Sequence, residues 1–141
     1  MSKNLIIIRG ISGSGKTTLA SELSYSYEMQ RINVVHLETD MYFYDENGDY
    51  NFDVSKLGYY HKKCLSDARD GLELDKVVIV SNTFTTLKEL KPYFELAKEF
   101  DIVPIVYHCQ NKFQNVHNVP ENVLEKQKNR FQYDISSLYE N

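Results

Sequence analysis

The sequence predicts an α/β fold in which a mainly parallel sheet carries helices on both faces, giving three layers. Four short apolar runs alternate with longer segments that have helical periodicity. Continuous apolar runs are typical of strands buried on both faces, and their alternation with helices favours parallel pairing. No composition shift or Pro-, Gly- or Ser-rich linker interrupts the 141 residues, so we expect a single domain over residues 1–141.

The strands are expected at residues 5–8, 32–37, 77–80 and 102–108, and the main helices at residues 16–27, 54–70, 92–100 and 120–131. Asp53 can cap the second helix, and Gly71 is expected to end it. Thr86 and Glu89 form a capping-box pattern that opens another helix, but Pro92 predicts a break inside that helix.

The segment from Asp45 to Asp53 is acidic and rich in asparagine. A calcium-binding loop starting at Asp45 would need glycine at its sixth position, where Tyr50 stands. The Asn47-Gly48 pair between aromatic residues instead predicts a hairpin turn.

Composition excludes several classes of protein. The chain has 16 basic and 20 acidic residues, a net charge of −4, so contact with nucleic acid would need a local basic patch, for which the candidates are Lys62, Lys63, Lys126, Lys128 and Arg130. Cys64 and Cys109 are its two cysteines, which argues against a disulfide scaffold or a cysteine zinc site. No apolar run reaches the roughly 18 residues of a membrane span, and we expect a cytoplasmic protein without membrane contact. The sequence leaves the oligomeric state open.

Residues 10–17 read Gly-Ile-Ser-Gly-Ser-Gly-Lys-Thr and follow an expected strand directly. This spacing is the P-loop pattern, in which inward-pointing backbone N–H groups and a helix N-terminus bind phosphates. We therefore expect a P-loop kinase fold that binds ATP and Mg²⁺, with Lys16 bridging the β- and γ-phosphates as a catalytic residue and Thr17 on the metal. The predicted ATP-binding residues are Gly10, Ser12, Gly13, Ser14, Gly15, Lys16, Thr17 and Thr18.

A carboxylate follows the second strand, at the sheet edge where ligands bind in open α/β folds. Asp40 is the predicted catalytic base for an acceptor hydroxyl and a candidate metal ligand, with Glu38 as the competing carboxylate. Many P-loop proteins have an aspartate for the magnesium shell after the third strand, but here Ser81 and Asn82 stand there. Asp40 takes over part of that shell, or metal binding is weak.

Several other residues are candidates for the acceptor side of the site. Asn82 and Thr83 can hydrogen-bond an acceptor or simply begin a polar loop, and Tyr42 can stack on a base or pack in the core. His61 either packs or lines the acceptor pocket, whereas Cys64, one turn later, is expected in the core.

Taken in order, these features resemble the P-loop kinase group that contains the 5′-kinase domain of bacteriophage polynucleotide kinase. They resemble still more the small ATP-binding proteins of the ubiquitin-ligase-binding-protein type, which are often described as AAA-type ATPases. Beyond the P-loop, the resemblance runs from residue 4 to about residue 131 and rests on residues 40–43, 48–53, 61 with 64, 80–83, 91–93, 117–120 and Arg130.

The resemblance implies that Asp40 is the general base toward a 5′-hydroxyl and that residues 110–120 form a lid over the nucleotide. Such lids usually carry an Arg-Asn pair, and the matching positions here are Gln114 and Asn115. Lys112 or Arg130 can substitute for the missing arginine, although lysine presents a point charge and not a planar fork.

The sequence leaves three functions open. The first is an ATP-dependent polynucleotide 5′-hydroxyl kinase, which would use the local basic patch to hold nucleic acid. The second is a kinase for a small acceptor such as a nucleoside or a sugar, which the negative net charge favours. The third is an ATP-binding module without transfer activity, indicated by Ser81, Phe84 and Gln114 at positions where the resembled kinases carry charge or hydrogen-bonding groups.

Overall fold

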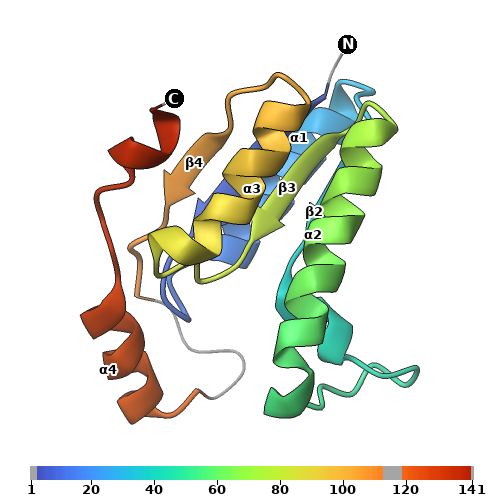
Figure 1. The fold of residues 1–141 in the computed structure, drawn as a ribbon. Helices are drawn as coiled ribbons and strands as arrows, with labels where there is room; N and C mark the ends of the chain where they lie inside the picture. Colours follow the sequence, from blue (N-terminus) through green and yellow to red (C-terminus); the bar gives the residue numbers. More distant parts are fainter. Residues whose placement is uncertain (1–2, 113–118, 141) are drawn as a thin grey trace.

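The computed structural model describes residues 3–112 and 119–140. Its sheet has four strands: β1 (Asn4–Arg9), β2 (Val34–Leu37), β3 (Val77–Ser81) and β4 (Ile105–His108). They lie in the order β2-β3-β1-β4, and all three pairings are parallel. The α/β fold with a parallel sheet, predicted from the sequence, is confirmed (Figure 1).

Helices cover both faces of the sheet (Figure 1). On one face α1 (Lys16–Met29) packs against the side chains that alternate strand residues direct that way, among them Ile6, Ile8 and Ile79. On the other face α2 (Leu57–Glu73) and α3 (Leu87–Glu99) bury a larger cluster with Leu5 and Val78. The chain then continues into α4 (Glu121–Arg130), which Figure 1 shows beyond the carboxyl ends of the strands.

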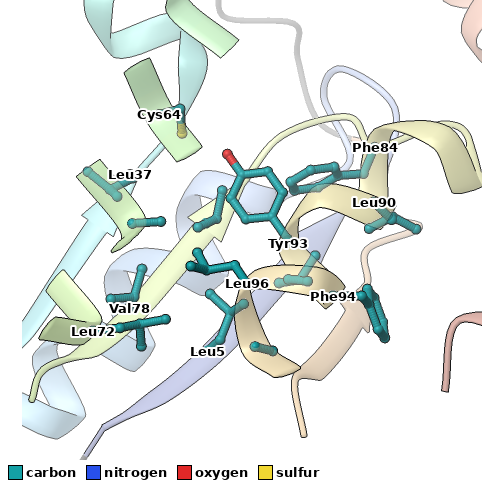
Figure 2. Packing of buried hydrophobic residues seen from close by; sticks show 14 residues of the cluster. Leu5, Leu37, Cys64, Leu72, Val78, Phe84, Leu90, Tyr93, Phe94 and Leu96 are labelled. Atoms are coloured by element: carbon teal, nitrogen blue, oxygen red, sulfur yellow. The ribbon is translucent and has the colours of Figure 1, made fainter. Parts of the chain in front are cut away.

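The larger cluster contains Cys64 from α2 and Tyr93 from α3, with the hydroxyl end of the tyrosine directed toward Cys64 (Figure 2). Burial raises the pKa of the Cys64 thiol above its ordinary value, so this group stays protonated and packs as an apolar side chain. Its place in the core is the one expected from the sequence.

Strand register brings the ends of the strands to one edge of the sheet. Ile8 pairs with Ser81, Arg9 with His108, and Leu37 with Val80. The residues that follow β1, β2 and β3 therefore emerge side by side, which is where open α/β sheets bind ligands.

The expected break at Pro92 is wrong, because α3 is continuous from Leu87 to Glu99. Its capping box is present: Thr86 Oγ1 accepts the Glu89 N–H at 3.3 Å, and Glu89 Oε2 accepts the Thr86 N–H at 3.0 Å. A proline removes one helical hydrogen bond, here to the carbonyl of Lys88, and both residues are exposed so that water can serve that carbonyl. The buried face of the helix outweighs this local cost.

The expected hairpin is much reduced, to one isolated antiparallel bridge between Tyr44 and Tyr50. A 3₁₀ helix, Thr39–Phe43, occupies the start of the segment. The Asp45 carboxylate accepts the N–H groups of Asn47 and Asp49, both at 2.9 Å, and so organises the turn from its own side chain. A turn stabilised by hydrogen bonds to the Asp45 side chain therefore stands where the pattern predicted two paired strands.

Gly71 does not end α2, which continues to Glu73. A Cβ atom at position 71 would stand 2.7 Å from Val78 Cγ2 and 3.1 Å from Val35 Cγ1. The glycine is therefore required for close packing of the helix on the sheet, and not for a left-handed helix end.

This contact predicts that Gly71→Ala lowers the free energy of unfolding by about 1–3 kcal/mol, because the stiff valine side chains leave no room for a methyl group. The matched control is Gly58→Ala in the same helix, where a Cβ atom meets nothing within 4 Å. That variant should be neutral or stabilised by up to about 1 kcal/mol, since alanine loses less entropy in a helix. Urea denaturation of both variants measures the difference, and equal stabilities would contradict the close-packing argument.

Candidate functional site

The P-loop backbone turns tightly between β1 and α1. Gly13 and Gly15 have φ values of 81° and 99°, in the left-handed region that favours glycine, and α1 begins directly after Gly15. Gly10 is required for a different reason, because a Cβ atom there would stand 2.6 Å from the carbonyl oxygen of Cys109. The sequence thus forms a compact loop whose backbone lies at the N-terminus of a 14-residue helix.

A cavity of about 520 Å³ opens where this loop meets the ends of β2 and β3. Its walls are the loop, the segment after β2, the start of α2 and one face of α4. It brings together most of the site residues predicted from the sequence: Ser12, Gly13, Gly15, Lys16, Thr17, Thr18, Asp40, His61, Asn82, Thr83 and Arg130.

Other predicted residues lie elsewhere. Ser14 is buried beneath the loop, and its hydroxyl has no hydrogen-bond partner among the described residues. The Ser14 carbonyl accepts the Asn111 N–H at 3.2 Å, which ties the loop to the chain after β4. Lys112 is exposed and does not line the described part of the cavity. Gln114, Asn115 and most of the predicted 110–120 lid lie outside the described residues.

Tyr42 points away from the cavity, toward α2. Its hydroxyl donates to Asp67 at 2.5 Å, and its ring stacks on Tyr60 with centroids 5.6 Å apart. Burial and the Asp67 hydrogen bond raise the pKa of Tyr42 above its ordinary value. Tyr42 is partly buried against the larger core cluster, so core packing, the alternative to stacking on a base, describes its surroundings.

Lys16 is the main cation of the phosphate-binding end. Its Nζ donates to the carbonyl of Ile11 at 3.0 Å, within the loop itself. Burial lowers the pKa of Lys16 below its ordinary value, while the negative charges of Asp40 and Glu38 oppose part of that shift. A half-buried ammonium at the N-terminus of a helix is an environment in which bound phosphate gains strong charge-assisted hydrogen bonds.

Two carboxylates reach the cavity from the segment after β2. Glu38 Oε2 accepts hydrogen bonds from Thr17 Oγ1 at 3.2 Å and from Ser81 Oγ at 3.0 Å. Asp40 lies in the following 3₁₀ helix, where its Oδ1 accepts the Tyr50 hydroxyl at 3.3 Å. The two acids therefore contact different parts of the site: Glu38 contacts the P-loop threonine, and Asp40 contacts the wall formed by residues 44–52.

The donor set fits Mg²⁺, a hard cation that prefers oxygen ligands and is usually bound by one or two protein side chains together with phosphates and water. Thr17 supplies a hydroxyl and Glu38 a carboxylate that already touch each other. Within the described residues, no group of three or more His, Cys, Asp or Glu side chains could hold a metal without other ligands. The site therefore fits a cation that arrives with the phosphates.

His61 and Asn82 hold the residue just before Asp40. The Thr39 N–H donates to Asn82 Oδ1 at 2.8 Å, and Thr39 Oγ1 lies 3.0 Å from His61 Nδ1. These contacts fix the backbone at the end of β2 to β3 and to α2. Both residues also line the cavity, so they can serve the acceptor side as well.

Gln127 was not predicted from the sequence. Its Oε1 accepts the Ser12 N–H at 2.9 Å, and its Nε2 donates to Ser12 Oγ at 3.2 Å. Gln127 is the one buried residue of α4, a helix in which Val123 and Leu124 are the apolar residues. No spacing pattern singles out this glutamine, because a polar residue in a mostly polar helix carries no sequence signal.

Arg9 was also missed, although a charged residue that ends an apolar strand is a signal. Its side chain is 1% exposed, and it donates to the carbonyls of Phe84 at 2.8–3.0 Å and Gln132 at 2.7 Å. Its guanidinium lies 4.2 Å from the centre of the Phe131 ring. Arg9 thus joins the strand before the P-loop to the segment that follows α4.

Arg130 contributes the second cation of the cavity lining. Its Nε donates to Thr85 Oγ1 at 2.9 Å, and that hydroxyl donates to Glu89 Oε2 at 2.8 Å. The other members of the predicted basic patch lie outside the lining of the described cavity. Lys63 pairs with Asp67 at 3.5 Å, and Lys128 pairs with Glu125 at 3.6 Å.

This fold and this loop define the class of protein: a P-loop protein with a kinase-like α/β fold, suited to binding nucleotide phosphates at the carboxyl edge of its sheet. None of the helices in residues 3–112 and 119–140 combines the length and apolar character needed to cross a membrane.

The chain belongs to the AAA domain family, whose sequence profile matches residues 5–112. It is 30% identical over 131 residues to an uncharacterized protein of Pasteurella multocida, covering 86% of this chain and 73% of that one. It is also 25% identical over 143 residues to the bifunctional polynucleotide phosphatase/kinase of Schizosaccharomyces pombe. That match covers 92% of this chain but 30% of the fission yeast protein. These matches confirm the resemblance to P-loop kinases.

Solved structures share the fold. Kti12 of Chaetomium thermophilum, in complex with ADP-AlF3, matches with a TM-score of 0.69 at 14% identity, covering 92% of this chain and 80% of Kti12. The APS kinase CysC of Mycobacterium tuberculosis, in complex with AMPPNP and APS, matches with a TM-score of 0.63 at 16% identity, covering 90% of this chain and 69% of that one.

The position of Lys16 predicts that Lys16→Ala weakens ADP binding roughly 10- to 100-fold, because a charge-assisted hydrogen bond to phosphate is lost. Isothermal titration with ADP measures the change. Lys62→Ala is the control, since it removes the same charge from an exposed position on α2 outside the cavity lining. Equal affinities of the two variants would contradict the phosphate-binding role of Lys16.

Proposed function

We propose that this protein is an ATP-dependent phosphotransferase that moves the γ-phosphoryl group of ATP to an acceptor hydroxyl. The observation that carries the proposal is that Asp40 lines the same cavity as the P-loop residues Lys16 and Thr17. The negative charge of Asp40 acts on the Lys16 ammonium and opposes the lowering of its pKa by burial. A carboxylate facing the phosphate-binding end is what acceptor activation needs, since phosphoryl transfer depends on positioning and electrostatics. ATP is preferred over GTP here because the sequence has no guanine-reading Asn-Lys-x-Asp motif.

In the proposed reaction the loop N–H groups and Lys16 hold the β- and γ-phosphates. Thr17 and a carboxylate at the end of β2 would hold Mg²⁺, which when bound would neutralise charge on the phosphate oxygens. Asp40 takes the proton of the acceptor hydroxyl, whose oxygen forms a bond to the γ-phosphorus. The bond between that phosphorus and the bridging oxygen breaks, and ADP leaves with the electron pair.

The base assignment predicts that Asp40→Asn lowers the transfer rate at least about 100-fold, because general-base catalysis is lost, while ADP affinity stays within about twofold. Transfer of labelled γ-phosphate and titration with ADP separate the two effects. Asp101→Asn is the control: this acid lies in the turn after α3 with φ of 57°, a conformation that asparagine also adopts. Full transfer activity in Asp40→Asn would show that another group is the base.

A polynucleotide 5′-hydroxyl is the leading acceptor, supported by the similarity to the fission yeast phosphatase/kinase. A small neutral acceptor, such as a nucleoside or a sugar, is the second candidate. The small acceptor is favoured by the side of the cavity that Tyr50, Phe52 and Leu57 line, because these residues present uncharged surface. We call these three residues the acceptor wall. Among the described lining residues, Lys16 and Arg130 are the cations, fewer than a channel for a polyanion usually has.

Salt dependence separates the two acceptors. A 5′-hydroxyl oligonucleotide held through its phosphates should bind less tightly as salt rises, with a log–log slope of about −0.7 for each contacted phosphate. Arg130→Ala should then make the slope shallower by about 0.7, the contribution of one contacted phosphate. A slope near zero, together with transfer to a nucleoside or a sugar, supports the small acceptor. Nucleotide binding without transfer to any of these acceptors would indicate a binding module and overturn the proposal.

A further inference from the structure

Glu38 occupies a position that the proposed reaction does not yet explain. Its Oε2 accepts the hydroxyl of Thr17 at 3.2 Å, and Thr17 directly follows the phosphate-binding Lys16 in the first turn of α1. In P-loop proteins this hydroxyl is the protein group that goes to Mg²⁺. A carboxylate that already contacts the hydroxyl stands beside the place where the cation binds.

The end of β3 explains why a carboxylate is needed from elsewhere. P-loop NTPases generally hold the magnesium shell with an aspartate from another strand of the sheet. Within the described part of this chain, β3 ends in Ser81, which is 1% exposed and carries no charge. β2 is the direct neighbour of β3, with Leu37 opposite Val80, so Glu38 stands next to Ser81 at the same sheet edge.

Ser81 and His36 fix the direction of the Glu38 side chain. Ser81 Oγ donates to Glu38 Oε2 at 3.0 Å, so its single proton is used and its oxygen can accept. His36 Nε2 lies 2.7 Å from Ser81 Oγ. His36 Nε2–H therefore donates to Ser81 Oγ, and the Ser81 hydroxyl donates to Glu38. The serine at the end of β3 thus acts as the support of a carboxylate supplied by β2.

We propose that Glu38 is the magnesium-shell carboxylate of the nucleotide site, that Ser81 is its positioning residue, and that Asp40 serves the acceptor instead. The contacts of the two acids differ accordingly: Glu38 contacts Thr17, whereas Asp40 accepts the hydroxyl of Tyr50 in the acceptor wall. This inference rests on the proposed nucleotide binding, and it assigns to Glu38 the metal role for which Asp40 is the candidate in the sequence.

The test measures ADP affinity by isothermal titration with Mg²⁺ and with a chelator, so that no turnover is needed. In wild-type protein Mg²⁺ should tighten ADP binding. In Glu38→Gln the enhancement should be at least about tenfold smaller, which is the effect of removing the support of a metal ligand. The affinity for ADP without Mg²⁺ should stay equal or increase. Mn²⁺ in place of Mg²⁺, followed by electron paramagnetic resonance, reports metal binding to the ADP complex directly.

Two variants act as references. Glu22→Gln removes the same charge from an exposed position on α1 and should keep the full Mg²⁺ enhancement. Asp40→Asn should also keep it. Loss of the enhancement in Asp40→Asn, with retention in Glu38→Gln, overturns the proposal and gives the metal role to Asp40.

Ser81→Ala tests the positioning role, because it removes the donor to Glu38 but keeps the carboxylate. We expect a smaller loss of the Mg²⁺ enhancement than in Glu38→Gln and no change in binding without Mg²⁺. An unchanged enhancement overturns the role of Ser81. Wild-type protein that binds no ADP under either condition overturns the proposed function itself, whereas ADP binding with the enhancement intact in Glu38→Gln overturns this inference alone.

Discussion

The P-loop must reverse direction between a buried strand and the first turn of a helix, and the rest of the site is arranged around that reversal. The conformation of the loop depends on its glycines and also on Arg9, the residue directly before it. The Arg9 guanidinium is buried and donates hydrogen bonds to the carbonyls of Phe84 and Gln132. Burial lowers the pKa of Arg9 and the charge of Glu89 opposes that shift, so this cation is retained by carbonyl dipoles and a nearby acid.

Much of this arrangement can be predicted from the sequence, because it rests on signals that are local in the chain. The strand cores, the P-loop and the capping box at Thr86 are patterns of neighbouring residues, and each appears where the pattern predicts it. Gly71 and Pro92 were misjudged because each has a local meaning that tertiary packing overrides. Gly71 is explained by Val78, a residue of the adjacent strand, and Pro92 is tolerated because it lies on the exposed side of α3 while the opposite side of the helix is buried.

The site shows the same division between local and distant information. Lys16 and Thr17 belong to a motif, so the roles proposed for them follow from spacing alone. The contact between Thr17 and Glu38 joins residues 21 positions apart, and the contact between Ser12 and Gln127 joins residues 115 positions apart. Nothing in residue type or periodicity reports such pairs, since they depend on which loops the sheet edge brings together.

Gln127 links the last helix to the P-loop through both atoms of one amide group. The segment that follows this helix is joined in turn to the end of β1, since Arg9 donates to the carbonyl of Gln132. The C-terminal part of the described chain therefore contacts the P-loop and the strand before it through side-chain hydrogen bonds. By thermodynamic reciprocity, a displacement of α4 that changed the affinity for a nucleotide by some free energy would be opposed or favoured by the bound nucleotide to the same extent.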